Sequence, residues 1–341
     1  MTAGAGARRP LDLGFELSNL CNLHCTHCIR GSHQSRIDRL TLPFVARVLD
    51  DATAHFDPVS VVFTGGEPLA AELFPDAVAE LARRDLRWRM VTNGWLIPRR
   101  LDAILSHPPE FVRISLSGGS EETHDAQRGR GSFRRALLGA AVLLTREVPV
   151  ELSLVVLREN RHELDDAARL AADLGARELH LILPQPTPES AANESDLGPG
   201  EWDEIAGSIT ELAARSALPV RLDYGFRMPL ERRAACGPLA GRQLYVDAQG
   251  RVPFCCQLSR YGSGDEPIVG DLTTEPFAEV VTRLDRDVAR YVADTAARHA
   301  RGAWDRLDDY PCLSCARHAG RTGFLADFPT HPWTTLARIP A

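Results

Sequence analysis

The sequence of 341 residues contains no lysine, so arginine supplies all 39 basic residues. Without a side-chain amine the chain cannot form a Schiff base, which excludes pyridoxal-phosphate chemistry and a lysine nucleophile. The formal net charge is −7, and no polybasic run is present. Such a surface lacks the positive field that binds a nucleic-acid backbone, so we expect no nucleic-acid partner.

Long apolar runs are also missing. No stretch reaches the roughly 18 apolar residues of a membrane-spanning helix, and the N-terminal MTAGAGARRPLDLG lacks the apolar core of a signal peptide. We therefore expect a cytoplasmic protein with no membrane partner. Disulfides are rare in that reducing compartment, so the eight cysteines indicate metal ligands or catalytic thiols.

Apolar runs alternate with helix-like segments over the first half of the chain. The expected strands are 11–18, 59–66, 87–93, 111–117, 150–157 and 178–184. Segments with apolar residues at three- and four-residue spacing begin near Leu42, Leu69, Arg99, Ser132 and Arg161. This alternation predicts an α/β fold with a parallel sheet. The pattern is compatible with both an open barrel and a doubly wound sheet.

The segment PQPTPESAANESDLGPG (184–200) is typical of a connector. The elements expected after it are a helix over 202–217, a strand over 220–223, a β-hairpin in LYVDAQGRVPF that turns at Gln249-Gly250, and an amphipathic helix over 276–301. The C-terminal FLADFPTHPWTTLARIP is apolar for a tail, and we expect it to pack back on the barrel. The charge pairs Asp308-Asp309 and Arg232-Arg233 are interpreted as solvated.

Three cysteines, Cys21, Cys25 and Cys28, follow directly on the first expected strand. The carboxyl end of a parallel sheet is where such folds place their active sites. A structural zinc ion takes four ligands, and His24 or His27 could supply the fourth. A cubane iron–sulfur cluster takes one thiolate per iron, so three thiolates leave one iron open.

The spacing Cys21-x3-Cys25-x2-Cys28 resembles the signature of the radical S-adenosylmethionine (SAM) superfamily. The resemblance covers about residues 11–190 and implies a partial (β/α)6 TIM-like barrel. It implies a [4Fe–4S] cluster whose open iron chelates SAM and yields a 5′-deoxyadenosyl radical that abstracts a hydrogen atom from carbon. An electron donor such as flavodoxin or ferredoxin is an implied partner.

The run Thr64-Gly65-Gly66-Glu67-Pro68 ends the second expected strand and resembles the family's GGEP motif, which binds the SAM amino group. Two glycines allow backbone to approach a ligand, and a carboxylate can hold an ammonium. Alone, the motif is commonly a turn. One βα unit after the cysteine loop, it strengthens the resemblance.

The resemblance extends to four further SAM-contacting positions, which are His27, Ser115, Arg128 and Asn160. His27 precedes the third cysteine, where the family often has an aromatic residue near the adenine. Ser115 and Arg128 resemble positions that contact the ribose and the carboxylate, and a guanidinium suits a carboxylate. The ordinary alternatives are a loop histidine and a surface arginine.

A second cysteine set follows the order Cys236, hairpin, Cys255, helix, and then Cys312-x2-Cys315. Cys312-x2-Cys315 alone could be half a zinc ribbon. The whole order resembles the shortened SPASM, or twitch, domain of radical SAM enzymes. It implies a second, auxiliary [4Fe–4S] cluster closed by these four thiolates. The implied domains are a tail (1–10), the radical SAM core (11–190), a connector (191–230), the twitch-like domain (231–320) and a C-terminal tail (321–341).

One thiol is left over, which is Cys256, or Cys255 if the assignment is reversed. Adjacent residues on a strand point to opposite faces, so both are not expected to bind one cluster. The spare thiol is either a small buried hydrophobe or, by resemblance to radical SAM epimerases, a hydrogen-atom donor. We take epimerisation, with Cys256 as donor, as the leading expectation.

Other outcomes stay open. One is two-electron oxidation of an aminocyclitol or sugar alcohol with the auxiliary cluster as electron acceptor, and another is cross-linking of a ribosomal peptide. The substrate is expected to be a natural product, either a peptide or an aminoglycoside, sugar or nucleoside. The cysteine loop begins about twenty residues from the start, which leaves no room for a leader-peptide-binding domain and weighs against a peptide. A zinc- or cluster-stabilised binding module is the non-enzymatic alternative.

Overall fold

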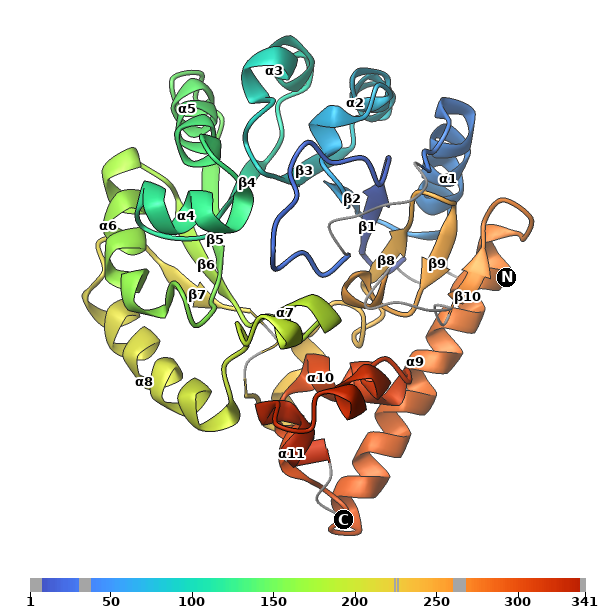
Figure 1. Ribbon diagram of the computed structural model, residues 1–341. Coiled ribbons are helices and arrows are strands. Elements are labelled where there is room, and N and C mark those ends of the chain that lie inside the picture. The colour runs from blue at the N-terminus through green and yellow to red at the C-terminus, as the bar shows by residue number, and fades with distance from the viewer. Residues whose placement is uncertain (1–7, 31–37, 224, 226, 260–267, 338–341) are drawn as a thin grey trace.

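The computed structural model describes residues 8–30, 38–223, 225, 227–259 and 268–337. Its centre is one curved sheet in the order β7-β6-β5-β4-β3-β2-β1-β8, with every neighbouring pair parallel (Figure 1). The strands are β1 (Leu11–Glu16), β2 (Val59–Thr64), β3 (Arg87–Thr92), β4 (Phe111–Leu116), β5 (Val150–Val155), β6 (Glu178–Ile182), β7 (Val220–Leu222) and β8 (Gln243–Val246). The predicted α/β class with a partial barrel is confirmed.

Helices cover the outer face of the sheet (Figure 1). They are α1 (Leu42–His55), α2 (Phe74–Arg83), α3 (Ile97–Ser106), α5 (Ser132–Leu144), α6 (Leu164–Leu174) and α8 (Pro199–Arg215), whereas α4 (Glu121–Arg128) lies inside this ring and packs against α5 (Figure 1). The predicted starts at Leu42 and Ser132 are confirmed. Helix α2 begins later than predicted because a 3-10 turn over Pro68–Ala70 precedes it. Helix α4 was not predicted because its only apolar residue is Ala126.

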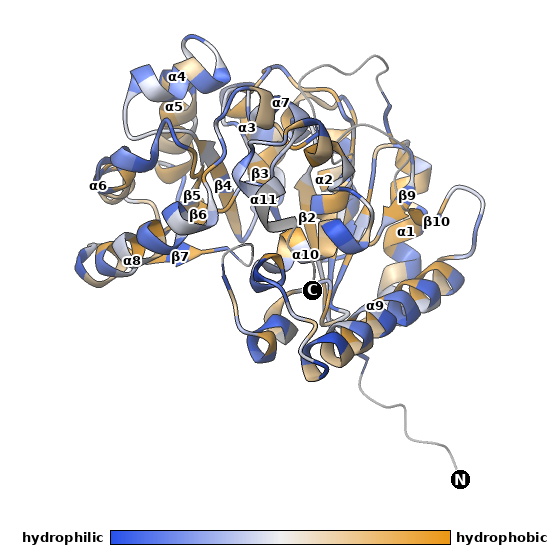
Figure 2. Ribbon diagram, turned by 60° about the horizontal axis from the view of Figure 1, so that its bottom comes forward, coloured by the Kyte–Doolittle hydropathy of each residue, from blue (hydrophilic) through white to orange (hydrophobic). Residues whose placement is uncertain are grey.

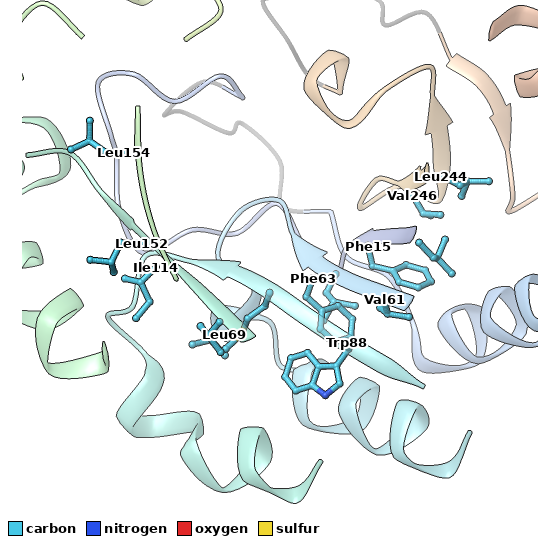
Figure 3. Packing of buried hydrophobic residues seen from close by; sticks show 14 of the residues in the cluster. Phe15, Val61, Phe63, Leu69, Trp88, Ile114, Leu152, Leu154, Leu244 and Val246 are labelled. Atoms are coloured by element: carbon cyan, nitrogen blue, oxygen red, sulfur yellow. The ribbon is translucent and has the colours of Figure 1, made fainter. Parts of the chain in front are cut away.

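Each strand builds the core with one face and a cavity with the other, because strand side chains alternate. Phe63, Trp88 and Ile114 are fully buried under the helices (Figure 3). The rings of Phe63 and Trp88 lie 5.6 Å apart between centroids. Ser60 and Arg89, from the opposite face of the same strands, line the inner cavity.

The prediction that the two halves of LYVDAQGRVPF pair with each other as a hairpin is wrong. Strand β8 pairs with β1, whereas β9 (Arg251–Pro253) pairs antiparallel with β10 (Ile268–Asp271). The turn at Gly250 is present, with φ of 84°. Asp247 tightens it by accepting the amides of Gln249 and Arg251, each at 2.9 Å. The two halves of the expected hairpin therefore join different sheets.

The C-terminal part contains α7 (Pro188–Ala192), α9 (Phe277–Ala300), α10 (Pro311–His318) and α11 (Pro332–Ala337). Helix α9 confirms the predicted amphipathic helix, and its polar residues follow its outer side (Figure 2). The tail packs on the connector and on the segment before α10. His331 lies 3.1 Å from Asp196, and the Trp333 ring lies 4.8 Å from that of Tyr310. No helix among the described residues has the length and apolarity to span a membrane.

The expectation that Asp308 and Arg233 are solvated is wrong. Asp308 is 0% exposed and Arg233 is 4% exposed. Each is held by hydrogen bonds from distant segments, which a pair of charges in the sequence does not reveal.

Candidate functional site

The cysteine loop, residues 17–30, leaves β1 at the carboxyl end of the sheet, as predicted. Cys21, Cys25 and Cys28 lie on it, and all three are partly exposed. The Cys28 amide donates to the Cys25 carbonyl over 3.2 Å and closes a turn between them. Burial raises the pKa of Cys21 to about 12, so metal binding must displace a proton from this thiol.

The glycine-rich turn after β2 packs directly on the cysteine loop. Gly65 has φ of 114°, and a Cβ there would collide with the Glu16 side chain. A Cβ on Gly66 would collide with the carbonyl oxygen of Leu20. The Glu67 amide donates to that same oxygen over 2.8 Å. The two glycines therefore bring the motif against the chain's own loop, whereas the sequence analysis related them only to a ligand.

The Glu67 carboxylate is 1% exposed and is held by three donors of the chain itself. It accepts from Thr92 Oγ1 at 2.6 Å, from the Asn93 amide at 2.8 Å and from the Leu69 amide at 3.1 Å. Burial raises its pKa. The Asn93 side chain in turn lies 4.0 Å from Cys21 Sγ. Sequence reasoning missed Thr92 and Asn93, which end β3 and tie the two motifs together.

Arg128 and His27 lie together at the edge of the cavity. Arg128 is 8% exposed, which rules out the surface-arginine alternative. Its Nε donates to Ser117 Oγ at 2.6 Å, and its Nη2 lies 3.4 Å from His27 Nε2. Burial and the charge of Arg128 lower the pKa of His27, so the imidazole is neutral. Ser115 and Arg128 both line the cavity.

Asn160 lies away from the cavity wall and is fully buried. Its Oδ1 accepts the Leu157 amide at 2.8 Å, and its Nδ2 donates to the carbonyls of Val155 (2.8 Å) and Ser117 (3.1 Å). These bonds join the ends of β4 and β5. They indicate a positioning role for Asn160, and its predicted contact with SAM stays a prediction.

The inner cavity measures about 720 Å³ and runs along the inside of the barrel to the second cysteine set. A smaller cavity adjoins it and is lined by four cysteines, namely Cys236, Cys255, Cys312 and Cys315, of which the first three also line the inner cavity. These are the four predicted ligands of the auxiliary site. Cys256 lines the inner cavity and does not belong to the lining of the small one.

Cys255 and Cys256 do not lie on a strand, because β9 ends at Pro253, so strand alternation does not distinguish them. A 3-10 turn begins at Cys256, and the two thiols share a hydrogen bond. Gln243 Nε2 lies 3.7 Å from Cys256 Sγ. Cys255 lines both cavities, whereas Cys256 lines only the inner one.

Neither cysteine set has the spacing of a mononuclear zinc site. A tetrahedral zinc ion with bonds of about 2.3 Å holds its sulfurs about 3.8 Å apart. Among the described residues, neither set brings three ligand atoms within 4.8 Å of one another. The donors are all soft thiolates at wider spacing, which fits an iron–sulfur cluster better than a single zinc ion.

Glu151, Glu178 and His180 do lie within 4.8 Å of one another inside the barrel. Arg113 pairs with Glu151 at 2.7 Å, and Arg221 pairs with Glu178. These arginines already neutralise the carboxylates, so the group is an ion-pair network of the barrel interior.

A buried group that sequence reasoning missed connects the two cysteine regions. Arg30, which follows the cysteine loop, donates to the hydroxyl of Tyr245 on β8 at 2.8 Å. That hydroxyl lies 3.4 Å from Glu16 Oε2 on β1. Gly14 makes room for the ring, since a Cβ there would lie 2.8 Å from Tyr245 Cδ2. Tyr245 and Cys256 line the same cavity.

A partial parallel barrel with three cysteines after its first strand and a glycine-rich turn after its second defines a class of enzymes that use SAM and an iron–sulfur cluster. The family model of the radical SAM superfamily matches residues 15–171. Mycofactocin maturase MftC of Mycobacterium ulcerans is 30% identical over 276 residues, which are 80% of this chain and 70% of that protein. The chain belongs to the radical SAM superfamily. Membership implies SAM and one [4Fe–4S] cluster.

Other relatives carry different names. AdoMet-dependent heme synthase of Methanosarcina barkeri is 31% identical over 221 residues, 62% of this chain and 61% of that protein. The chain thus spans about three fifths of that relative's length. PqqA peptide cyclase of Ruegeria pomeroyi is 28% identical over 323 residues, 90% of this chain and 80% of that protein.

Solved structures share the fold. SuiB of Streptococcus suis, bound to the precursor peptide SuiA, superimposes with a TM-score of 0.64 at 12% identity, covering 80% of this chain and 65% of that one. Native anSMEcpe, bound to AdoMet and a peptide, gives 0.63 at 22% identity and covers 83% of each chain.

Proposed function

We propose that this enzyme uses SAM to modify a peptide, holds an auxiliary [4Fe–4S] cluster on Cys236, Cys255, Cys312 and Cys315, and inverts a stereocentre with Cys256 as hydrogen-atom donor. The position of Cys256 on the wall of the inner cavity, outside the small cavity of the other four cysteines, carries this proposal. The named relative PqqA peptide cyclase favours a peptide over a sugar.

In this proposal Cys21, Cys25 and Cys28 hold the first cluster, and Gly65, Gly66, Glu67 and Pro68 form the turn that receives the SAM amino group. SAM, when bound to that cluster and reduced, supplies a 5′-deoxyadenosyl radical. Ser115 and Arg128 line the inner cavity, and the neutral His27 imidazole lies beside Arg128. The buried Arg128 guanidinium provides the charge for a carboxylate.

The hydrogen count balances for inversion. One hydrogen atom leaves the substrate carbon on one face, and the Cys256 S–H bond returns one on the other. The remaining sulfur radical needs one electron and one proton to restore the thiol. We assign the electron to an external carrier of the flavodoxin or ferredoxin type.

Oxidation or cross-linking is the second candidate. Cys236, Cys255 and Cys312 line the small cavity and also reach the inner cavity. A cluster held there would lie close enough to a substrate radical to accept an electron. This arrangement supports a two-electron oxidation of a peptide, in which a substrate carbon forms a new bond to another carbon or to a heteroatom.

The test compares the parent enzyme with Cys256→Ala and the isosteric Cys256→Ser, using anaerobic enzyme, SAM, a reductant and candidate precursor peptides encoded beside its gene. In D2O, inversion places one deuterium on the inverted carbon. We expect both variants to form 5′-deoxyadenosine without inverted product. Unchanged product from Cys256→Ala, with two hydrogens lost from the peptide, would establish the oxidative candidate instead.

A further inference from the structure

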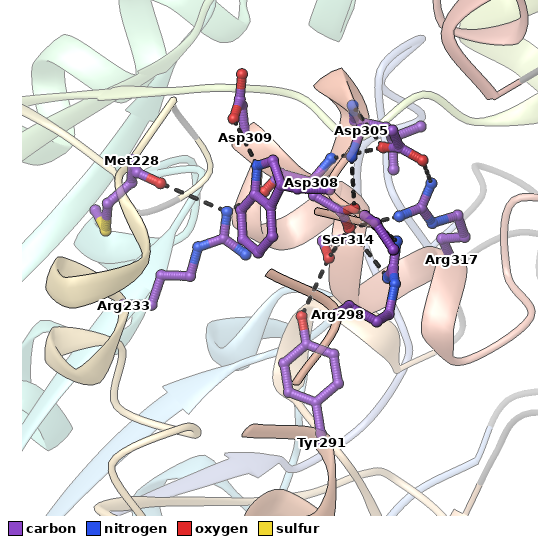
Figure 4. Close-up of polar contacts among 12 residues, drawn as sticks. Met228, Arg233, Tyr291, Arg298, Asp305, Asp308, Asp309, Ser314 and Arg317 are labelled. Carbon is purple, nitrogen blue, oxygen red and sulfur yellow. Dashed lines mark hydrogen bonds and ion pairs between the residues drawn. The ribbon is translucent and has the colours of Figure 1, made fainter. Parts of the chain in front are cut away.

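Arg233 is a buried cation beside the auxiliary cysteines, three positions before Cys236, and it is 4% exposed. Its guanidinium carbon lies 4.7 Å from the centroid of the Trp304 ring. Its Nη2 donates to the carbonyl oxygen of Asp308 and lies 3.5 Å from that of Met228 (Figure 4). Its Nε and Nη1 are buried and have no hydrogen-bond partner within the described ranges.

The side-chain carboxylate of Asp308, whose backbone carbonyl accepts from Arg233, is already paired with other residues. Asp308 Oδ2 pairs with Arg298 at 2.7 Å, and Oδ1 pairs with Arg317 and accepts from Ser314 Oγ at 3.0 Å (Figure 4). Within Asp308, Arg233 donates only to the backbone carbonyl oxygen. The aspartate is therefore balanced by two other arginines.

The Asp309 carboxylate is also engaged by other residues. Asp309 lies 3.3 Å from Arg227, and its Oδ1 accepts the Trp304 indole N–H at 2.9 Å. A buried guanidinium with two unsatisfied donors is costly unless an anion faces it. The Asp308 and Asp309 carboxylates are both engaged by other residues, so neither supplies that anion.

The Cys236 amide donates to the Arg233 carbonyl over 2.9 Å, and Cys315 lies on α10, which follows Asp308 in the chain. Burial raises the pKa of Cys315, while a hydrogen bond from Tyr291 and the charge of Arg233 act in the opposite direction. The Tyr291 hydroxyl, from α9, also lies 3.3 Å from Ser314 Oγ (Figure 4). Arg233, bonded to the Cys236 amide, and Tyr291, bonded to the residue before Cys315, thus approach the second cysteine set from two different elements.

We propose that Arg233 and Tyr291 are positioning residues that set the reduction potential of the auxiliary cluster. The inference rests on the auxiliary cluster of the proposed function. A site with four thiolates is anionic, and it becomes more negative on reduction. A fixed cation and a hydrogen bond to a ligand sulfur stabilise the reduced form and raise the potential.

The test isolates the second cluster in the full-length chain with Cys21, Cys25 and Cys28 changed to alanine. Iron and acid-labile sulfide are measured after anaerobic reconstitution, and the midpoint potential is measured by a redox titration followed by EPR. Arg233→Met removes the charge, Arg233→Lys retains it, and Tyr291→Phe removes the hydroxyl. Arg232→Met, at the exposed neighbouring position, is the matched control.

We expect Arg233→Met and Tyr291→Phe to keep their iron and to shift the potential to more negative values, with Arg233→Lys shifted less than Arg233→Met and Arg232→Met unshifted. An unshifted Arg233→Met with full iron overturns the inference. If Arg233 variants do not fold, an unshifted Tyr291→Phe overturns it and a shifted one supports it. Loss of all iron from the parent background contradicts the auxiliary cluster itself, which is a separate failure.

Discussion

The Glu67 backbone amide donates a hydrogen bond to the carbonyl oxygen of Leu20 across 2.8 Å, so the glycine-rich turn is fastened to the start of the cysteine loop. The two motifs, 46 positions apart as measured from Cys21 to Glu67, meet through backbone atoms. Any side chain added between them must push one motif away from the other.

Gly66→Ala tests this contact. Its Cβ would lie 2.7 Å from the carbonyl carbon of Asn19, which is backbone and cannot move alone. We expect the free energy of unfolding to fall by about 1–3 kcal/mol, and the first cluster to lose iron on reconstitution. Gly207→Ala in α8, with open space around it, is the control and should stabilise the helix by about 0.5–1 kcal/mol. Equal effects of the two variants would contradict the contact.

Thr92→Val removes the 2.6 Å hydrogen bond to the buried Glu67 carboxylate. The cost should be about 1–3 kcal/mol of unfolding free energy. Burial already raises the pKa of Glu67, and the lost bond is one that lowers it. A carboxyl group with a raised pKa in the folded state loses stability as pH rises. Denaturant unfolding should therefore show a larger loss at about pH 8 than at about pH 5, and a pH-independent loss would contradict this assignment.

The iron content of cysteine variants distinguishes the ligands of the two proposed clusters from Cys256. Cys315→Ala should remove the auxiliary cluster and Cys21→Ala the first one, so each variant should retain about half of the parent's iron and sulfide, since each cluster holds four irons. Cys256→Ala should retain all of it, because Cys256 lies outside the small cavity of the other four cysteines. Iron loss in Cys256→Ala, with full iron in Cys255→Ala, would reverse the assignment of these two neighbours.

Asp308→Ala leaves Arg298 and Arg317 without their shared buried carboxylate. Removing one partner of a buried ion pair costs about 3–5 kcal/mol. Burial opposes ionisation of Asp308, but the Asp305 amide and the charge of Arg317 outweigh it and lower its pKa. A lowered pKa gives stability that is present above about pH 4 and lost below it. Asp294→Ala, at an exposed position of α9, is the control and should change the melting temperature little.

Local sequence patterns were sufficient for strands β1 to β7 and for the first cysteine set. The alternation in VSVVFT and FVRISL fixes which side chains face the helices, because a strand has a period of two. The loop with Cys21, Cys25 and Cys28 lies within one short segment, so its position after β1 follows from the order of the sequence.

Contacts between distant segments were decided only by the tertiary structure. The partners of Glu67 end a different strand, and Arg233 is buried because α10 and its preceding turn pack over it. Strand β8 pairs with β1 instead of β9, a choice that the alternation in LYVDAQGRVPF does not encode. Burial and charge pairing depend on which segments meet in space, so a residue type and its neighbours in sequence cannot determine them. Motif spacing was enough to indicate the class of chemistry and, through the family resemblance, the barrel, whereas only the packing shows that Cys256 lines the inner cavity and not the small one.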